Sequence, residues 1–340
     1  MKLAEVTFMR IETDKRIEVA LLIYPDCQMA AIHGLTDLFR IANEWAAYPH
    51  EDDRRCFIRV THWQWNPQSG RMECCWDSDP GDVNAPGFVI SPPSVAMPER
   101  MSAMPNEAQW LKTLHSGGTI MCSVCAGAFV LAQTGLLARR RVTTHWAFAG
   151  LLAGTYTDVQ VTTENVVIDD GDVITSGAIL AWNDLGLLIV DRTMGSSVML
   201  ATARFMLSDG IRQDQRPLQG FLPKLDHDDA ALLAVQRSIL AEPGLRHTVS
   251  TLAERAHLTE RTFIRRFQKA TGLNPADYIR QVRMAKARDA LQLGDIPVAQ
   301  LASTLGYDDV SAFRKAFQSI VGMSPSAYRN HFRIRRRAQR

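Results

Sequence analysis

One short segment of the sequence has the residue types and the spacing of a nucleophilic site. In SerValCysAlaGlyAlaPhe at 123–129, strand-like residues lead into Cys125, and three small residues follow it. A strand that turns at once into a helix presents the side chain at the turn, as in the nucleophile elbow of hydrolases. A thiol there faces the amino terminus of the following helix, which favours the thiolate and predicts a lowered pKa.

A cysteine at a tight turn is not by itself a catalytic group. Nucleophilic catalysis also needs a base and a group that orients the base. His145, in ThrThrHisTrp at 143–146, is one residue that could accept the proton of the thiol. Trp146 beside it offers an aromatic face that suits a cation, although core packing is the commoner role of tryptophan. The residues alone leave open a catalytic site, a ligand pocket and a buried structural cysteine.

The other cysteines predict neither a metal centre nor a disulfide. Cys122 and Cys125 form one CxxC, and no second CxxC or HxxxH accompanies it, so no zinc site and no other cofactor is expected. With Cys122 in a strand, the two lie about 10 Å apart, whereas a disulfide needs Cα atoms about 5.5 Å apart. Reduced thiols are typical of cytoplasmic proteins.

The last hundred residues contain a duplication. Five residue types recur at an offset of fifty, in Phe263/Phe313, Phe267/Phe317, Gly272/Gly322, Pro275/Pro325 and Tyr278/Tyr328. Identical types in one register predict two copies of one structural unit. The glycines of the pattern suit the left-handed ends of helices.

Each copy is predicted to be a helix, a turn and a second helix, with the phenylalanines facing inward. The expected helices are 249–256 and 259–270 in the first copy, and 297–305 and a helix capped by Asp308 or Asp309 in the second. Between the copies, 275–293 reads as one helix about 28 Å long. A rigid spacer of that size suits two successive segments of the DNA major groove, which lie about 34 Å apart.

Charge is distributed unevenly along the chain. Residues 229–340 hold 19 Lys and Arg against 9 Asp and Glu, whereas residues 1–228 hold 19 against 27. A net charge of +10 in the duplicated part and −8 in the rest predicts that only the former meets a polyanion.

The duplicated part closely resembles the AraC/XylS family of transcription regulators over residues 229–333. The family's end signature stands here as GYDDVSAFRKAFQSIVGMSPSAYR at 306–329. One departure is His257, where the family usually has glycine, although histidine tolerates a left-handed backbone better than a branched residue does. The resemblance implies contacts to bases from the outward residues of both second helices, namely Arg261, Ile264, Arg265, Val310, Ser311, Arg314 and Lys315.

The first two thirds of the chain alternate strand-like and helical segments. Strands are expected near 16–24, 56–63, 118–124, 159–162 and 173–176, with helices near 34–43, 106–114, 127–134 and from Ile179. This alternation predicts an α/β domain with a mostly parallel sheet sandwiched by helices. Gly70–Pro105, rich in proline and glycine, is expected to be a loop-rich excursion.

This part resembles the PfpI-like, class I glutamine amidotransferase-like fold, a flavodoxin-like architecture, in the form that precedes an AraC-type domain in GlxA-type regulators. The most specific match is CSVCAGAFVLAQTGLLARRRVTTHW at 122–146, which places Cys125 on the elbow cysteine. Hydrolytic and redox relatives set a carboxyl group against that thiol, and the corresponding residue here is Ala31. The resemblance therefore implies a non-catalytic ligand pocket at Cys125, Ala126, His145 and Trp146.

Together these observations predict a sequence-specific, DNA-binding transcription regulator and not an enzyme. The expected domains are a sensing and dimerisation domain at 16–212, a linker at 213–228, a DNA-binding domain at 229–333 and a basic tail at 334–340. Partners implied are promoter DNA, a small nitrogenous effector, a second copy of the chain and, for an activator, RNA polymerase. The alternative is a cysteine-dependent hydrolase or amidase fused to a DNA-binding module.

Composition excludes some broad classes. With 46% hydrophobic and 22% charged residues in 340, the chain has the balance of a globular protein of more than one domain. No apolar run reaches the roughly 18 residues of a membrane span, and the first residues lack the apolar core of a secretion signal. A cytoplasmic location and no membrane partner are expected.

Overall fold

The computed structural model describes residues 15–47, 56–81 and 85–333. Contacts divide the chain into two compact units, residues 1–215 and 216–340. The division falls between Gln215 and Arg216, inside the segment expected to be a linker. Among the described helices, none is long and apolar enough to cross a membrane.

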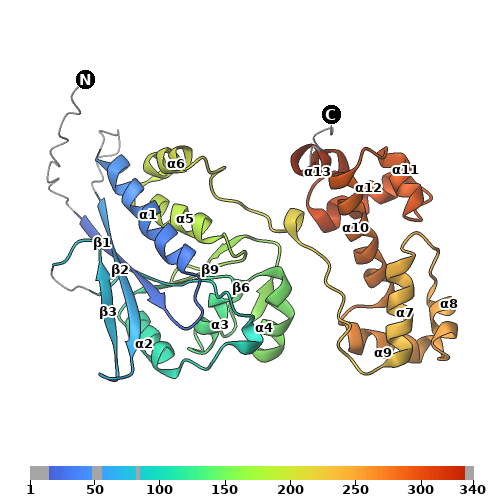
Figure 1. Ribbon diagram of the computed structural model, residues 1–340, viewed down its shortest axis with the longest axis horizontal. Coiled ribbons are helices and arrows are strands. Elements are labelled where there is room, and N and C mark those ends of the chain that lie inside the picture. Colours follow the sequence, from blue (N-terminus) through green and yellow to red (C-terminus); the bar gives the residue numbers. More distant parts are fainter. Residues whose placement is uncertain (1–14, 48–55, 82–84, 334–340) are drawn as a thin grey trace, which may run out of the picture. The chain divides into compact units, whose positions relative to one another are not determined.

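Unit 1 is built on a seven-stranded sheet of order β3-β2-β1-β4-β5-β9-β8 (Figure 1). The strands are β1 (Lys15–Ile23), β2 (Cys56–Asn66), β3 (Arg71–Asp77), β4 (Phe88–Ser91), β5 (Ile120–Val124), β8 (Val167–Asp169) and β9 (Val173–Ser176). Only the edge strands β3 and β8 pair antiparallel. A separate pair, β6 (Arg141–Thr143) and β7 (Gln160–Thr162), is parallel. The predicted mostly parallel sheet is confirmed.

Helices cover both faces of this sheet. One layer holds α1 (Met29–Ala46), α5 (Trp182–Met194) and α6 (Ser196–Phe205), which contact one another; the other holds α2 (Pro105–Ser116) and α3 (Gly127–Ala132). Helix α4 (Ala149–Thr155) packs against β7. Because helices cover both faces of the sheet, residues 19–22 in β1 and 88–91 in β4 are buried throughout.

The expectation of a loop-rich excursion over Gly70–Pro105 is wrong in part, because the segment contains two strands of the sheet. Strand β3 follows the tight turn at Gly70, and β4 lies in the middle of the sheet between β1 and β5. Strand β4 has only four residues and is flanked by proline-rich segments, so local signals hide it. Pairing on both sides makes it a strand, and that is a tertiary effect.

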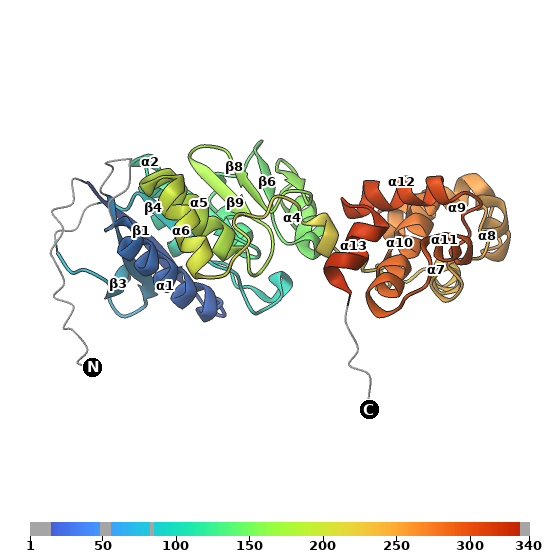
Figure 2. The ribbon, with the colours of Figure 1, turned by 90° about the horizontal axis from the view of Figure 1, so that it is seen from above.

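Unit 2 is helical throughout (Figure 2). Its elements are the 3-10 turn η3 (Arg216–Leu218), α7 (Ala230–Ala241), α8 (Val249–Arg255), α9 (Glu260–Thr271), α10 (Pro275–Leu293), α11 (Val298–Thr304), α12 (Val310–Val321) and α13 (Pro325–Phe332). The predicted helices and the 19-residue spacer helix α10 are confirmed within a residue or two.

The duplication is also present in the packing. Each copy has its own small core around an aromatic trio. In the first, the Phe267 ring lies 5.3 Å from Phe263 and 5.2 Å from Tyr278, nearly perpendicular to the latter. The second copy repeats this with centroid distances of 5.8 and 5.6 Å. Helix α10 gives its first half to one core and its second half to the other.

Capping residues set the ends of the two outer helices. Thr259 accepts a hydrogen bond from the Thr262 backbone, and Asp309 accepts bonds from the Ser311 and Ala312 backbones. Gly272 and Gly322 end the helices with φ of 79° and 84°, the left-handed region that favours glycine. The caps expected from the sequence are therefore present.

Candidate DNA-binding surface and ligand pocket

Helix α9 presents three of the predicted base-contacting residues to solvent. Arg261, Ile264 and Arg265 are all exposed, on the side of the helix away from Phe263 and Phe267. Ile264 is 37% exposed although it is apolar. An exposed isoleucine between two arginines fits a surface that makes apolar contact with a thymine methyl group beside polar contacts to other bases.

Helix α12 presents a similar surface with one difference. Ser311, Arg314 and Lys315 are exposed, as expected. Val310, expected to face outward, is half-buried and packs against the second core. Because Val310 is the first residue of α12, its side chain leans back towards the preceding turn.

The basic residues of unit 2 fall into two groups. One group is held by the protein itself: Arg266 pairs with Asp229 at 2.6 Å, and Arg280 pairs with Asp277 at 2.9 Å. The other group makes no ion pair within the described residues, and it includes Arg261, Arg265, Arg314 and Lys315. Free guanidinium groups on the two outer helices are available to phosphates and guanine bases.

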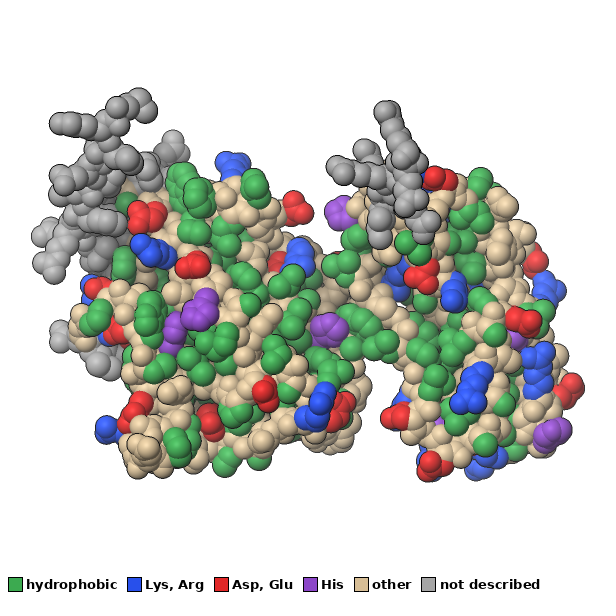
Figure 3. All heavy atoms as spheres, in the orientation of Figure 1, with side chains coloured by type: hydrophobic (Ala, Val, Ile, Leu, Met, Phe, Trp, Pro, Cys, Tyr) green, Lys and Arg blue, Asp and Glu red, His purple; other side chains and the backbone are tan. Residues whose placement is uncertain are grey.

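The two outer helices lie on one side of unit 2. Figure 2 shows α9 and α12 along the same side, and Figure 1 shows them at opposite ends of α10. Arg283 of α10 joins the two copies: its Nε donates to the Pro243 carbonyl at 2.9 Å, and its guanidinium lies over the Tyr307 ring at 5.4 Å. In Figure 3, Lys and Arg side chains on the visible face of this unit alternate with Asp and Glu.

A further set of contacts ties residues 216–228 to both helix-turn-helix copies; we call this segment the strap. Arg288, 7% exposed in α10, donates to the Arg216 carbonyl at 3.0 Å, and η3 packs against α12. The Phe221 ring stands edge-on to Tyr278 at 5.1 Å. Gln236 donates to the Lys224 carbonyl at 2.9 Å. These contacts could not be predicted from the sequence, because the segment is polar and interrupted by proline.

The turns of both copies contain a residue with a left-handed backbone, but of different types. His257 has φ of 55° and is exposed, and Gly306 in the second copy has φ of 75°. The left-handed backbone expected at His257 is thus present without glycine. A non-glycine residue in this conformation costs about 1–2 kcal/mol.

In unit 1, the strand, turn and helix expected around Cys125 are present. Strand β5 ends at Val124, Cys125 has φ of 54°, and α3 begins at Gly127. A Cβ atom added to Gly127 would lie 2.2 Å from the Ser91 carbonyl oxygen, so only glycine lets the helix approach the end of β4 so closely. Cys125 donates its backbone N–H to the Ser176 carbonyl at 2.7 Å.

The environment of the thiol contradicts the expected thiolate. Cys125 is only 2% exposed, and burial raises the pKa of its thiol to about 12. Helix α3 has six residues, so its dipole is small against the cost of burying a charge. Ala31, the position of the missing carboxyl group, is fully buried in the first turn of α1. A neutral thiol is the stable form here.

The segment that contains His145 lies beside the turn at Cys125. The neighbouring Thr144 hydroxyl donates a hydrogen bond to the Cys125 carbonyl at 2.7 Å. His145 Nδ1 accepts from the Ala147 backbone at 3.2 Å, and its ring lies 5.2 Å from Trp146. Burial lowers the pKa of His145. No hydrogen bond joins this ring to the thiol among the described residues, and Ala126, the remaining pocket candidate, is fully buried.

We expect Cys125 to react slowly with iodoacetamide at pH 8, because its thiol is buried and its pKa lies near 12. The rate should still be rising above pH 9, whereas an activated cysteine reaches its plateau below about pH 8. Mass spectrometry of labelled peptides measures this, with the exposed Cys74 as the internal control. A plateau at neutral pH would contradict the structure.

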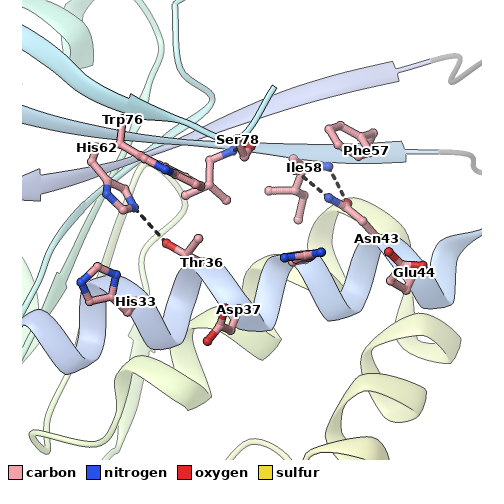
Figure 4. A pocket seen from close by; sticks show the side chains of 12 residues that line it. His33, Thr36, Asp37, Asn43, Glu44, Phe57, Ile58, His62, Trp76 and Ser78 are labelled. Carbon is pink, nitrogen blue, oxygen red and sulfur yellow. Dashed lines mark hydrogen bonds between the residues drawn. The ribbon is translucent and has the colours of Figure 1, made fainter. Parts of the chain in front are cut away.

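A pocket that the sequence did not reveal lies between α1 and strands β2 and β3 (Figure 4). Its volume is about 730 Å³, and none of the four predicted pocket residues lines it. From α1 come His33, Thr36, Asp37, Arg40, Asn43 and Glu44; from the strands and the end of β3 come Phe57, Ile58, Val60, His62, Trp76 and Ser78. Polar residues on one face of a helix look in sequence like an ordinary solvated face.

Comparison with known proteins agrees with both units. A family model for a helix-turn-helix domain matches residues 252–331 of the sequence. The family model for the DJ-1/PfpI family matches residues 71–192. The HTH-type transcriptional regulator CdhR of Pseudomonas aeruginosa is 30% identical over 226 residues, 65% of this chain and 66% of that protein. The HTH-type transcriptional regulator GlxA of Rhizobium meliloti is 24% identical over 222 residues, 64% of this chain and 68% of that protein.

The matched region spans about two thirds of the length of these relatives. A solved structure of an AraC family transcriptional regulator from Pseudomonas putida is similar with 14% identity and a TM-score of 0.43, over 56% of this chain and 99% of that chain.

Fold and comparisons define a protein in which a DJ-1/PfpI domain precedes a helix-turn-helix domain. The chain belongs to the AraC-type transcriptional regulators, in the GlxA-type group that carries this pair of domains.

Proposed function

We propose that the chain binds promoter DNA in a sequence-specific way and regulates transcription. The observation that carries the proposal is the pair of exposed, basic outer helices, α9 and α12, joined by α10. Within the part of the chain that the structure describes, Arg261, Arg265 and Arg314 on these helices form no ion pair. Base recognition is assigned to Arg261, Ile264, Arg265, Ser311, Arg314 and Lys315, with a smaller share for Val310. The predicted basic tail at 334–340 lies outside the described residues.

We further propose that unit 1 senses a small effector and forms a homodimer, without catalysis. A neutral, buried thiol and the alanine at position 31 support this role over that of a hydrolase. Activation, through contact with RNA polymerase, is the regulatory sense that the family resemblance favours. The domain limits predicted from sequence, 16–212, 213–228 and 229–333, stay part of this proposal.

Selection of binding sites from random duplexes with the full chain tests the proposal. We expect enrichment of a site with two parts about one helical turn apart, and an affinity that falls steeply between 50 and 200 mM salt through counterion release. Measuring Kd of the selected duplex by fluorescence anisotropy gives the salt slope. A folded protein that selects no sequence and binds no duplex at low salt would overturn the proposal.

A further inference from the structure

Helix α9 begins with an acidic residue, Glu260, which is exposed on the outward side of the helix. Its carboxylate makes no hydrogen bond or ion pair with any residue that the structure describes. The capping position before it is already filled, because the Thr259 hydroxyl accepts from the Thr262 backbone at 3.4 Å. The carboxylate is therefore not needed to cap the helix.

The two helix-turn-helix copies differ at this position. At the offset of fifty residues, Glu260 corresponds to Val310, which is half-buried and packs against the second core. The acid of the second copy stands one residue earlier, at Asp309, and its carboxylate accepts hydrogen bonds from two backbone N–H groups. A carboxylate used in this way stabilises the start of a helix. Asp309 has that role in α12, whereas Glu260 in α9 does not bond to the backbone.

Glu260 lies on the surface of α9 that carries the residues assigned to base recognition. It shares a side of the helix with Ile264, four residues on, and lines one open hollow together with Ile264, Arg261 and Arg265. The first residues of a recognition helix are those that reach base edges in the major groove. A carboxylate there is repelled by phosphates, so general attraction to DNA does not explain it.

A carboxylate can only accept hydrogen bonds, and this selects among the bases. In the major groove, guanine shows two acceptors, and thymine shows an acceptor and a methyl group, whereas cytosine shows the amino donor at N4. Adenine also has an amino donor, but its N7 acceptor stands beside that donor and repels a carboxylate. Glutamate therefore suits cytosine best.

We propose that Glu260 accepts a hydrogen bond from the amino group of a cytosine in the major groove, and so fixes a C·G pair in the part of the DNA site that the first copy binds. The inference rests on the proposed function, because it adds a specificity-determining residue to the base recognition assigned to α9. It gives the two parts of the site different requirements, since Val310 at the corresponding position has no acceptor in its side chain.

Selection of binding sites from random duplexes, with the full chain and with E260Q, tests the assignment. Glutamine has nearly the size of glutamate, but its amide also donates and suits adenine. We expect a C·G pair in the site of the unmodified chain, and a changed preference at this pair alone in E260Q. The pair should lie within about three base pairs of the one that Arg265 reads, because five residues of helix rise about 7.5 Å.

The effect is then measured as a ratio of Kd values by fluorescence anisotropy. Replacing the C·G pair with T·A should raise the Kd of the unmodified chain by about tenfold, and that of E260Q by about twofold at most. The matched control E242Q removes an exposed carboxylate at the end of α7, outside the outer helices, and should keep the ratio of the unmodified chain. An unchanged ratio in E260Q, with all duplexes bound more tightly alike, would show that Glu260 acts only through its charge and would overturn the inference.

A modified base tests whether the amino group itself is read. N4-methylcytosine keeps its pair with guanine and replaces the amino hydrogen that faces the major groove. We expect this base at the selected position to weaken binding of the unmodified chain by about tenfold and binding of E260A far less. An equal loss in both proteins would contradict a contact from Glu260.

The selection also separates this inference from the proposed function. If the unmodified chain and E260Q select the same base at every position, including those read by Arg265 and Arg314, the inference fails and the proposed function stands. If the folded, unmodified chain selects no sequence, the proposed function fails, and the inference that rests on it fails too.

Discussion

Arg265→Ala and Arg314→Ala should each relax base preference at a different position of the DNA site, about one helical turn apart. Both guanidinium groups are exposed, on α9 and α12 respectively, and neither has an ion-pair partner among residues that the structure describes. A paired hydrogen bond from arginine to guanine discriminates against the wrong base by about 1–3 kcal/mol. Binding-site selection on each variant measures the loss, which should leave the rest of the site unchanged.

A control separates base reading from attraction to phosphate. Arg280→Ala removes an exposed arginine of α10 that is already paired with Asp277 at 2.9 Å, so base preference should stay as it is. An arginine that touches only phosphate would weaken all sequences alike and reduce the salt slope by about one unit. Loss of preference at the same base pair in Arg265→Ala and Arg314→Ala, or at none, would contradict the placement of the two helices.

A fragment starting at residue 229 should be markedly less stable than one starting at residue 216. The shorter fragment lacks the strap, so Tyr278 loses the Phe221 ring, and buried Gln236 loses the Lys224 carbonyl and His227. Leaving a buried polar group without a partner costs about 1–3 kcal/mol, and a partly buried aromatic ring adds a similar amount. We expect a Tm lower by about 10 °C, measured by circular dichroism.

Substitutions within the longer fragment test the same contacts without truncation. Phe221→Ala should destabilise it, because the ring packs on the first core. Leu222→Ala is the matched control, since that side chain is 67% exposed and should shift the Tm by about a degree at most. Equal Tm values for the two fragments, or for the two variants, would show that the strap does not stabilise unit 2.

Much of unit 2 could be predicted from sequence because its signals are local. The offset of fifty residues, the caps at Thr259 and Asp309 and the glycines at 272 and 322 each act within a turn or two of the chain. Helix limits and inward-facing phenylalanines follow from such signals without knowledge of distant partners. Exposure of Arg261, Arg265 and Arg314 follows from the same helical periodicity.

Packing between segments far apart in the sequence decided the features that the sequence did not predict. Strand β4 exists because β1 and β5 pair with it, and neither is near it in sequence. The same packing buries Cys125, so desolvation outweighs the helix dipole and raises a pKa that the motif predicts to be low.

By itself, the sequence determined the family, the order of the two domains and the face of each outer helix, because repeats, caps and periodicity are properties of neighbouring residues. Only the tertiary structure decided which polar groups have partners and where a cavity opens. The pocket between α1, β2 and β3 is lined by residues from 33–44 and from 57–78. The strap accepts hydrogen bonds from α7 and α10, two helices that follow it in the chain. Such contacts depend on how whole elements pack, which no local pattern records.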